Sequence, residues 1–144
     1  MMTAEQALTQ STLYTDEVDY TLIHLPPGAI TPAAVVFAAI SDPFGALIAD
    51  KDEVTLLLAQ DDWEAYKHRL PDHTTTGPYR LITFDLELEP DLIGFMALIA
   101  RILAEANVSI LAFSAYARDH IFVQSNQFQT AWDALTTAQR ESGK

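Results

Sequence analysis

The sequence predicts an α+β protein made of two βαββα lobes in tandem, each an antiparallel sheet with helices on one face. Its 144 residues, 49% of them hydrophobic, suit one compact body or two half-size lobes that share a core. Strand, helix and hairpin follow one another in the same order in each half of the chain. Neither half can cover its apolar sheet face alone, so we expect the lobes to pack together.

The first half of the chain is expected to form a short helix, a strand, a second helix, a hairpin and a helical turn. We expect these elements at residues 3–12, at 20–25, from 31 onward, at 44–49 with 54–59, and at 61–69. Pro26 and Pro27 end the strand, because proline cannot donate to a β-ladder. Thr31 is a suitable N-cap, with Pro32 at the first helical position.

A polar segment separates the two lobes. Residues 70–78 contain two prolines, a glycine, an aspartate, a histidine and three threonines, without hydrophobic periodicity. We therefore predict an N-terminal lobe at 1–70, a linker at 71–78 and a C-terminal lobe at 79–144.

The second half has the sharper pattern, with a strand, a long helix, a hairpin and a last helix. These elements are expected at residues 82–89, 92–107, 109–116 with 120–124, and 128–135. Alternation of apolar and polar residues predicts that the strand has one solvated face, and helical spacing of apolar residues makes the long helix the firmest element. Ser125 or Asn126 is the expected cap of the last helix.

The chain is strongly acidic and contains no cysteine. Its 20 acidic and 8 basic residues give a formal net charge of −12, which repels nucleic-acid phosphates and anionic membrane surfaces. The same charge also keeps a small protein soluble, so it is only weak support for a cationic ligand. The absence of cysteine, of a signal-like N-terminus and of an apolar run of ~20 residues predicts a cytoplasmic protein.

Signatures of catalysis and of metal or nucleotide binding are missing from the sequence. The four histidines lie at spacings that do not suit one metal ion, and there is no HExxH motif. There is also no GxSxG elbow, GxGxxG loop or Walker lysine loop. We expect no catalytic residue, no metal site and no cofactor. Catalytic residues that are far apart in the sequence would leave no local motif, so enzymatic activity remains a minor alternative.

The segment Pro90–Gly94, where a strand turns into the long helix, is the most informative local feature. Asp91 is a candidate N-cap, and Gly94 lies in the first turn, where the missing side chain leaves backbone amides open to a ligand carboxylate. The alternative is that Gly94 only permits close packing of the helix on a neighbour.

The second feature is the hairpin that contains Tyr116 and Asp119. An aspartate at a turn often accepts hydrogen bonds from nearby backbone amides, which is the structural interpretation. The functional interpretation is that Asp119 pairs with an ammonium or guanidinium group, while the ring of Tyr116 packs on the apolar stem of the ligand.

Residues 79–138 resemble the C-terminal lobe of the tandem ACT-domain proteins that are related to the cytosolic arginine sensor. The motifs that carry this resemblance are PDLIG at 90–94, LAEANVSI at 103–110 and FSAYARDHIFV at 113–123. The first lobe resembles the family more loosely, through DKDEVTLL at 50–57. The resemblance implies a ferredoxin-like sheet in each lobe, homodimers, and an amino-acid pocket between the lobes.

The resemblance also implies a set of ligand contacts. Carried over position by position, they fall on Thr55, Leu56, Asp91, Ile93, Gly94, Ser109, Ser114, Tyr116 and Asp119. By this analogy Asp119 meets a basic side chain and Gly94 offers its backbone. The chain departs from the family at Ala115, where threonine is usual, and at His120, where an aromatic residue is usual. The lost threonine hydroxyl removes one polar contact.

We interpret the chain as a regulatory or sensor module that binds a small molecule, an amino acid, and has no catalytic activity. The alternative is a structural protein that uses its lobes only for assembly. Ala97, Ala100 and Ala104 on one flank of the long helix favour this alternative, because small side chains permit close approach. We expect a homodimer, with neither nucleic acid nor a membrane as a partner.

Overall fold

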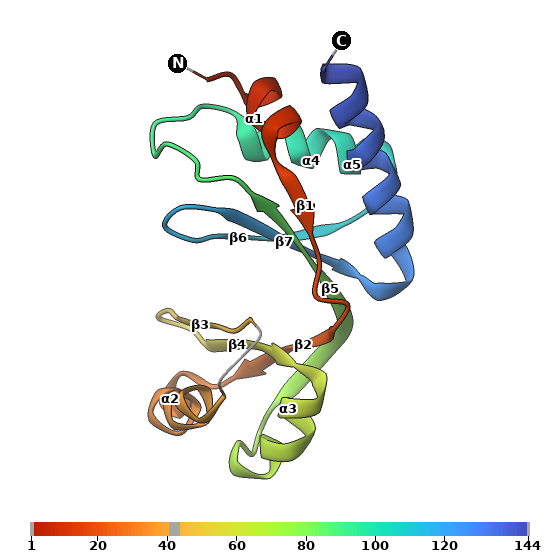
Figure 1. The fold of residues 1–144 in the computed structure, drawn as a ribbon. Coiled ribbons are helices and arrows are strands. Elements are labelled where there is room, and N and C mark those ends of the chain that lie inside the picture. The colour runs from red at the N-terminus through yellow and green to blue at the C-terminus, as the bar shows by residue number, and fades with distance from the viewer. Residues whose placement is uncertain (1, 41–43, 144) are drawn as a thin grey trace. The chain divides into compact units, whose positions relative to one another are not determined.

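The computed structural model describes residues 2–40 and 44–143, and the chain divides into two compact units (Figure 1). Met1–Glu17 and Arg80–Lys144 form one, which we call the terminal unit, and Val18–Tyr79 form the other, the middle unit. Each unit combines an antiparallel sheet with helices on one side, which confirms the predicted α+β, ferredoxin-like fold class.

The middle unit follows the order strand, helix, hairpin, helix, strand. Its elements are β2 (Asp19–Leu25), α2 (Ile30–Ala39), β3 (Ala46–Ala49), β4 (Val54–Ala59), α3 (Gln60–Tyr66) and the first part of β5 (Thr74–Asp85), with 3-10 turns at Pro27–Ala29 and Lys67–Arg69. The strands are ordered β3-β4-β2-β5. The predicted hairpin is confirmed, because Ala49 lies opposite Val54 across an antiparallel ladder.

The helices and the sheet of the middle unit enclose a core of nine buried residues. These are Ile23, Leu25, Ala33, Val36, Val54, Leu56, Leu58, Trp63 and Leu70. The three buried residues of β4 in this set alternate along the strand, as expected for one face of a sheet against helices.

The terminal unit is assembled from both ends of the chain. Its elements are α1 (Ala4–Gln10), β1 (Thr12–Tyr14), the second part of β5, α4 (Phe95–Glu105), β6 (Ile110–Ser114), β7 (Asp119–Gln124) and α5 (Phe128–Ser142), with a 3-10 turn at Ser125–Gln127. The sheet order is β1-β5-β7-β6. Thr12 lies opposite Asp85, so the N-terminal segment supplies an edge strand antiparallel to β5.

Helices α1, α4 and α5 pack against one another over one face of this sheet (Figure 1). The predicted stripe of α1, which is Ala4, Ala7 and Leu8, is buried in the shared core. Gln139 of α5 donates its side-chain N–H groups to the backbone oxygens of Leu8 and Ser11, at 3.0 and 2.7 Å. No helix in the described part of the chain is long and apolar enough to cross a bilayer.

The structure corrects the predicted lobe boundaries. Residues 74–78, within the predicted linker 71–78, are the start of β5, and residues 1–17 belong with the C-terminal segment instead of the N-terminal lobe. Threonine favours strands, but the nearby glycine and prolines masked that preference in the sequence. The pairing of β1 with β5 is a contact between distant segments, which no local pattern reveals.

Two predicted helix caps are wrong. Helix α2 begins at Ile30, so Thr31 lies inside it, and Ser125 and Asn126 lie in a 3-10 turn that leads directly into α5. In both places a backbone hydrogen bond takes the role of a side-chain cap: Ala29 N–H donates to the Pro26 oxygen, and Phe128 N–H donates to the Ser125 oxygen.

Gly77 of β5 provides a test of the strand packing in the middle unit. Its φ is +145°, and a Cβ atom at this position would lie 3.0 Å from the backbone oxygen of Tyr20. Gly77→Ala is therefore expected to lower the free energy of unfolding by about 1–3 kcal/mol. Gly28→Ala is the matched control, because a Cβ there meets no atom within 4 Å. Urea denaturation compares the two variants, and equal stabilities would contradict the close approach.

Candidate functional site

The site begins with an irregular segment, Leu86–Gly94, between β5 and α4. Strand β5 ends at Asp85 and α4 begins at Phe95, so the predicted strand to residue 89 and helix from residue 92 are both too long at this junction. Leu86 N–H donates to the Phe84 oxygen at 2.9 Å, which turns the chain out of the ladder. Leu88 N–H donates to the oxygen of Ala117 at 2.8 Å and ties the segment to the β6–β7 hairpin.

Gly94 is the N-cap of α4. Its φ is +85°, a left-handed conformation that glycine adopts without steric cost. Asp91 was predicted to be the cap, and this is wrong, because no side chain caps α4. The close-packing interpretation of Gly94 is also wrong, since a Cβ there would meet no atom within 4 Å. The backbone angle, not the space, requires glycine.

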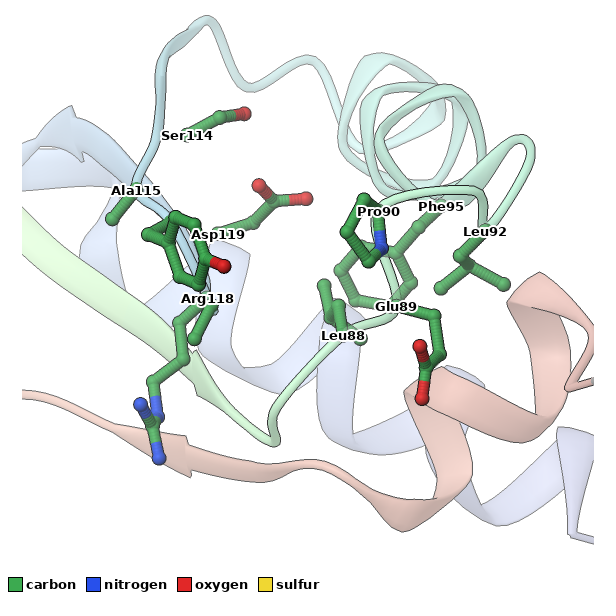
Figure 2. Close-up of a pocket in the computed structure, with 11 residues that line it drawn as sticks. Leu88, Glu89, Pro90, Leu92, Phe95, Ser114, Ala115, Arg118 and Asp119 are labelled. Carbon is green, nitrogen blue, oxygen red and sulfur yellow. The ribbon is translucent and has the colours of Figure 1, made fainter.

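The opposite wall of the site is the turn between β6 and β7. Ser114 lies opposite Asp119 in the ladder, and Ala115 N–H donates to the Arg118 oxygen at 2.9 Å. Arg118 Nε lies 2.8 Å from Asp85 Oδ1, and Figure 2 shows its guanidinium directed away from the side chain of Asp119. This exposed ion pair adds little stability. It means that Arg118, which lines the cavity, pairs with Asp85 and not with Asp119.

A cavity of about 300 Å³ lies between the two walls. It is lined by Leu88, Glu89, Pro90, Leu92, Phe95, Ser114, Ala115, Tyr116, Ala117, Arg118 and Asp119. Figure 2 shows the Asp119 carboxylate in the space between the hairpin and the segment that carries Pro90. The volume is at the lower end of the range for small-molecule sites.

The Asp119 carboxylate differs from the acidic group at the other hairpin. Asp50 Oδ1 accepts the backbone N–H groups of Asp52 and Glu53 at 2.8 and 3.0 Å, which is the structural role of an aspartate at a turn. Asp119 is instead the first residue of β7, and across residues 2–40 and 44–143 nothing donates a hydrogen bond to its carboxylate or forms an ion pair with it. The structural interpretation of Asp119 therefore fails.

The cavity combines charge with an apolar wall. Asp119 and Glu89 contribute carboxylates, while Leu88, Leu92 and Phe95 contribute hydrocarbon. The first bond within α4 runs from Leu98 N–H to the Gly94 oxygen, so the amides of residues 95–97 precede it at the positive end of the helix dipole. No group of three acidic or histidine side chains in the described parts of the chain is arranged to bind a metal ion.

The structure brings together some of the predicted ligand residues. Ser114, Tyr116 and Asp119 line the cavity, and Gly94 directly precedes Phe95 in its wall. The Tyr116 side chain is 97% exposed. Ile93 is exposed in the same segment, and Asp91 lines a neighbouring pocket with Leu88 and Leu92.

The other predicted ligand residues lie elsewhere. Ser109 is exposed next to Ile110, at the opposite end of β6 from the cavity. Thr55 and Leu56 belong to β4 of the middle unit, where Leu56 is fully buried in the core. These three residues are not part of the cavity in the terminal unit.

Sequence reasoning missed the apolar wall of the site. The periodic patterns place Leu88 in the strand and Leu92 and Phe95 on the apolar face of the helix, so they predict no cavity wall. The local signal for an irregular segment is the Pro90-Asp91 pair, which lies between the two periodic patterns.

His120, beside Asp119, has a perturbed ionisation. Its Nδ1 lies 2.8 Å from Thr83 Oγ1. The pKa of His120 is lowered from the usual 6.5, chiefly because burial disfavours the charged imidazolium. The positive charge of Arg118 lowers this pKa further, and the negative charge of Asp119 opposes the shift. The neutral imidazole is therefore favoured in the folded protein.

The match to a known protein family falls mostly in the terminal unit. Residues 75–137 match the family profile of the ACT domain, and this range includes both walls of the cavity. No curated protein sequence matches the chain.

Solved structures match almost the whole chain. A protein of unknown function from Vibrio cholerae is 25% identical, with a TM-score of 0.73 over 94% of this chain and 94% of that chain. A protein from Agrobacterium tumefaciens is 21% identical, with a TM-score of 0.71 over 88% and 87% of the two chains. The regulatory subunit of aspartate kinase from Thermus flavus is 15% identical, with a TM-score of 0.65 over 89% and 97%. At these identities the last two structures show a common fold.

The lowered pKa of His120 predicts a pH-dependent stability. Below pH 6.5 the unfolded chain takes up a proton at this position before the folded chain does, so the free energy of unfolding falls as pH falls toward the lowered pKa. His120→Asn keeps a hydrogen-bonding group but cannot titrate, and it is expected to remove this part of the pH dependence. Urea denaturation at pH 7.5 and at pH 5.5 measures the effect. Equal pH dependence in wild type and variant would contradict the assignment.

Proposed function

We propose that this protein is a regulatory module that binds an amino acid with a cationic side chain and has no catalytic activity of its own. The observation that carries the proposal is the Asp119 carboxylate, which borders the cavity without a partner among the described residues. A half-buried carboxylate without a partner favours an incoming cation, because a charge-assisted hydrogen bond compensates for its desolvation.

The remaining walls suit the rest of such a ligand. Leu88, Leu92 and Phe95 offer an apolar surface for an aliphatic stem, and the exposed ring of Tyr116 can cover it from the rim. The N-terminus of α4 has no side-chain cap, and its dipole favours the ligand carboxylate. Asp119 and α4 therefore select for opposite charges at the two ends of the ligand.

A regulatory role is supported by the kind of protein that shares this fold. Residues 75–137 match the ACT domain, and the similar Thermus flavus protein is a regulatory subunit of an enzyme. We carry the regulatory role over to this chain as part of the proposal. The acidic surface and the lack of cysteine favour a place in the cytoplasm.

An assembly protein is the second candidate. Ala97 and Ala104 are exposed on α4, so a small-residue flank is available for close contact with another chain. In that case the cavity would have no physiological ligand, and amino acids would leave the stability of the protein unchanged.

Asp119→Asn tests the proposed ligand site. Arginine and lysine are expected to raise the melting temperature of the wild type, because a ligand that binds only the folded state stabilises it. The variant should bind them at least about tenfold more weakly, since a hydrogen bond to a charged group contributes about 1.5–3 kcal/mol. Asp133→Asn, which removes the same charge from the exposed surface of α5, is the control and should bind normally.

A thermal-shift screen against all amino acids, followed by calorimetric titration, measures these effects. Unchanged affinity in Asp119→Asn would remove this residue from the site. A flat screen with the wild type would instead favour the assembly protein.

A further inference from the structure

Thr21 of β2 has a buried hydroxyl without a protein partner. The residue is 8% exposed, and in the described part of the chain two other polar residues are buried to a similar degree, Ser11 and Thr83. Ser11 Oγ donates to the Ala7 oxygen at 2.7 Å, and Thr83 Oγ1 lies 2.8 Å from His120 Nδ1. Among residues 2–40 and 44–143, no group forms a hydrogen bond with the Thr21 hydroxyl. Buried polar groups normally have a partner, so this hydroxyl requires an explanation.

The strand pattern favours an apolar residue at this position. Thr21, Ile23 and Leu25 alternate on one face of β2, and the two apolar residues are fully buried in the core of the middle unit. Across the ladder, Thr21 lies opposite Leu58, which is buried in the same core. A valine would occupy this place without a hydroxyl to satisfy. Departures from such a local rule are expected at functional sites.

Thr21 borders a cavity of about 200 Å³ in the middle unit. The cavity lies where β2, α3 and the first part of β5 meet (Figure 1). Its wall includes three threonines and three residues of α3, which are Thr21, Thr75, Thr76, Gln60, Trp63 and Glu64. It shares no residue with the cavity beside Asp119 in the terminal unit. Since the described residues offer the Thr21 hydroxyl no partner, a molecule in this cavity is the remaining source of one.

The wall of this cavity carries hydrogen-bonding groups and no unbalanced charge. Glu64 is the only ionisable residue among the described residues that line it, and its Oε2 lies 2.6 Å from Lys67 Nζ. An ion of either sign would therefore find no free counter-charge. The threonine hydroxyls and the Gln60 amide can each donate and accept hydrogen bonds. An apolar molecule would leave these groups unpaired, which costs binding energy.

We infer that this cavity binds a small neutral molecule with several hydroxyl groups. Each hydroxyl of such a ligand both donates and accepts, which matches the threonines of the wall. The volume lies below the range of about 300–1,000 Å³ for drug-sized ligands, so the ligand is no larger than a simple polyol or a monosaccharide. Trp63 gives the site a rigid support, because it is buried and its ring contacts that of His73 edge-on, with 4.8 Å between the centroids. The inference goes beyond the binding of a cationic amino acid and does not depend on it.

The indole N–H signals of the two tryptophans test the inference by NMR. Trp63 lines the cavity, whereas Trp132 packs against the core of the terminal unit and is the internal control. Glycerol, ribose and glucose are the probes, and Trp132→Phe assigns the two signals. At least one probe is expected to shift the Trp63 signal to saturation and to leave the Trp132 signal unchanged. Equal shifts of the two signals, or no saturable shift of the Trp63 signal with any probe, would overturn the inference.

Thr21→Val tests the role of the buried hydroxyl. No protein group loses a partner in this variant, so its free energy of unfolding, measured with urea, is expected to equal or exceed that of the wild type. The dissociation constant of the probe is expected to rise at least about fivefold, because one hydrogen bond to the ligand is lost. Thr12→Val, at an exposed position of β1, is the matched control and should bind the probe normally.

Unchanged affinity in Thr21→Val would overturn the inference, as would an equal loss in Thr12→Val. Asp119→Asn should bind the probe as the wild type does, and Thr21→Val should bind arginine and lysine as the wild type does. The two ligand sites can therefore fail separately.

Discussion

Strand β5 is the element on which both sheets depend. It pairs with β2 in the middle unit, and with β1 and β7 in the terminal unit. Because β1 pairs antiparallel with β5, the N-terminal segment belongs to the same unit as the C-terminal half of the chain. Helix α1 then joins α4 and α5 in one core, and Gln139 fastens it by two hydrogen bonds to backbone oxygens.

The two units share the order strand, helix and hairpin, in β2-α2-β3-β4 and β5-α4-β6-β7, but they differ at the junction between this strand and this helix. In the middle unit, Pro27–Ala29 form a 3-10 turn that continues directly into α2. In the terminal unit, Leu86–Gly94 form an irregular segment that ends in a left-handed glycine. The longer junction moves the start of α4 away from the strand end and leaves the cavity beside Asp119. The two hairpin aspartates differ accordingly, since Asp50 supports its own turn and Asp119 does not.

The proposed ligand site belongs to one unit of the chain. The proposed ligand site combines carboxylates with an apolar wall in the terminal unit. The net charge of −12 agrees with the proposed cationic ligand, because acidic residues attract a cation.

The sequence by itself determined the fold class, the hairpins, the apolar stripe of α1 and the presence of the long helix, because each depends on periodicity within a short window. The family resemblance grouped Gly94, Ser114, Tyr116 and Asp119; the structure places the last three in one cavity wall, with Gly94 directly before Phe95, and ligand binding by them stays a prediction. Only the tertiary structure decided that residues 1–17 join the terminal unit, that residues 74–78 are a strand, and that Leu88, Leu92 and Phe95 form a cavity wall. These features arise from pairing and packing between segments far apart in the chain. Such contacts leave no local pattern, since the partner that satisfies a backbone group or covers an apolar side chain is not its neighbour in the sequence.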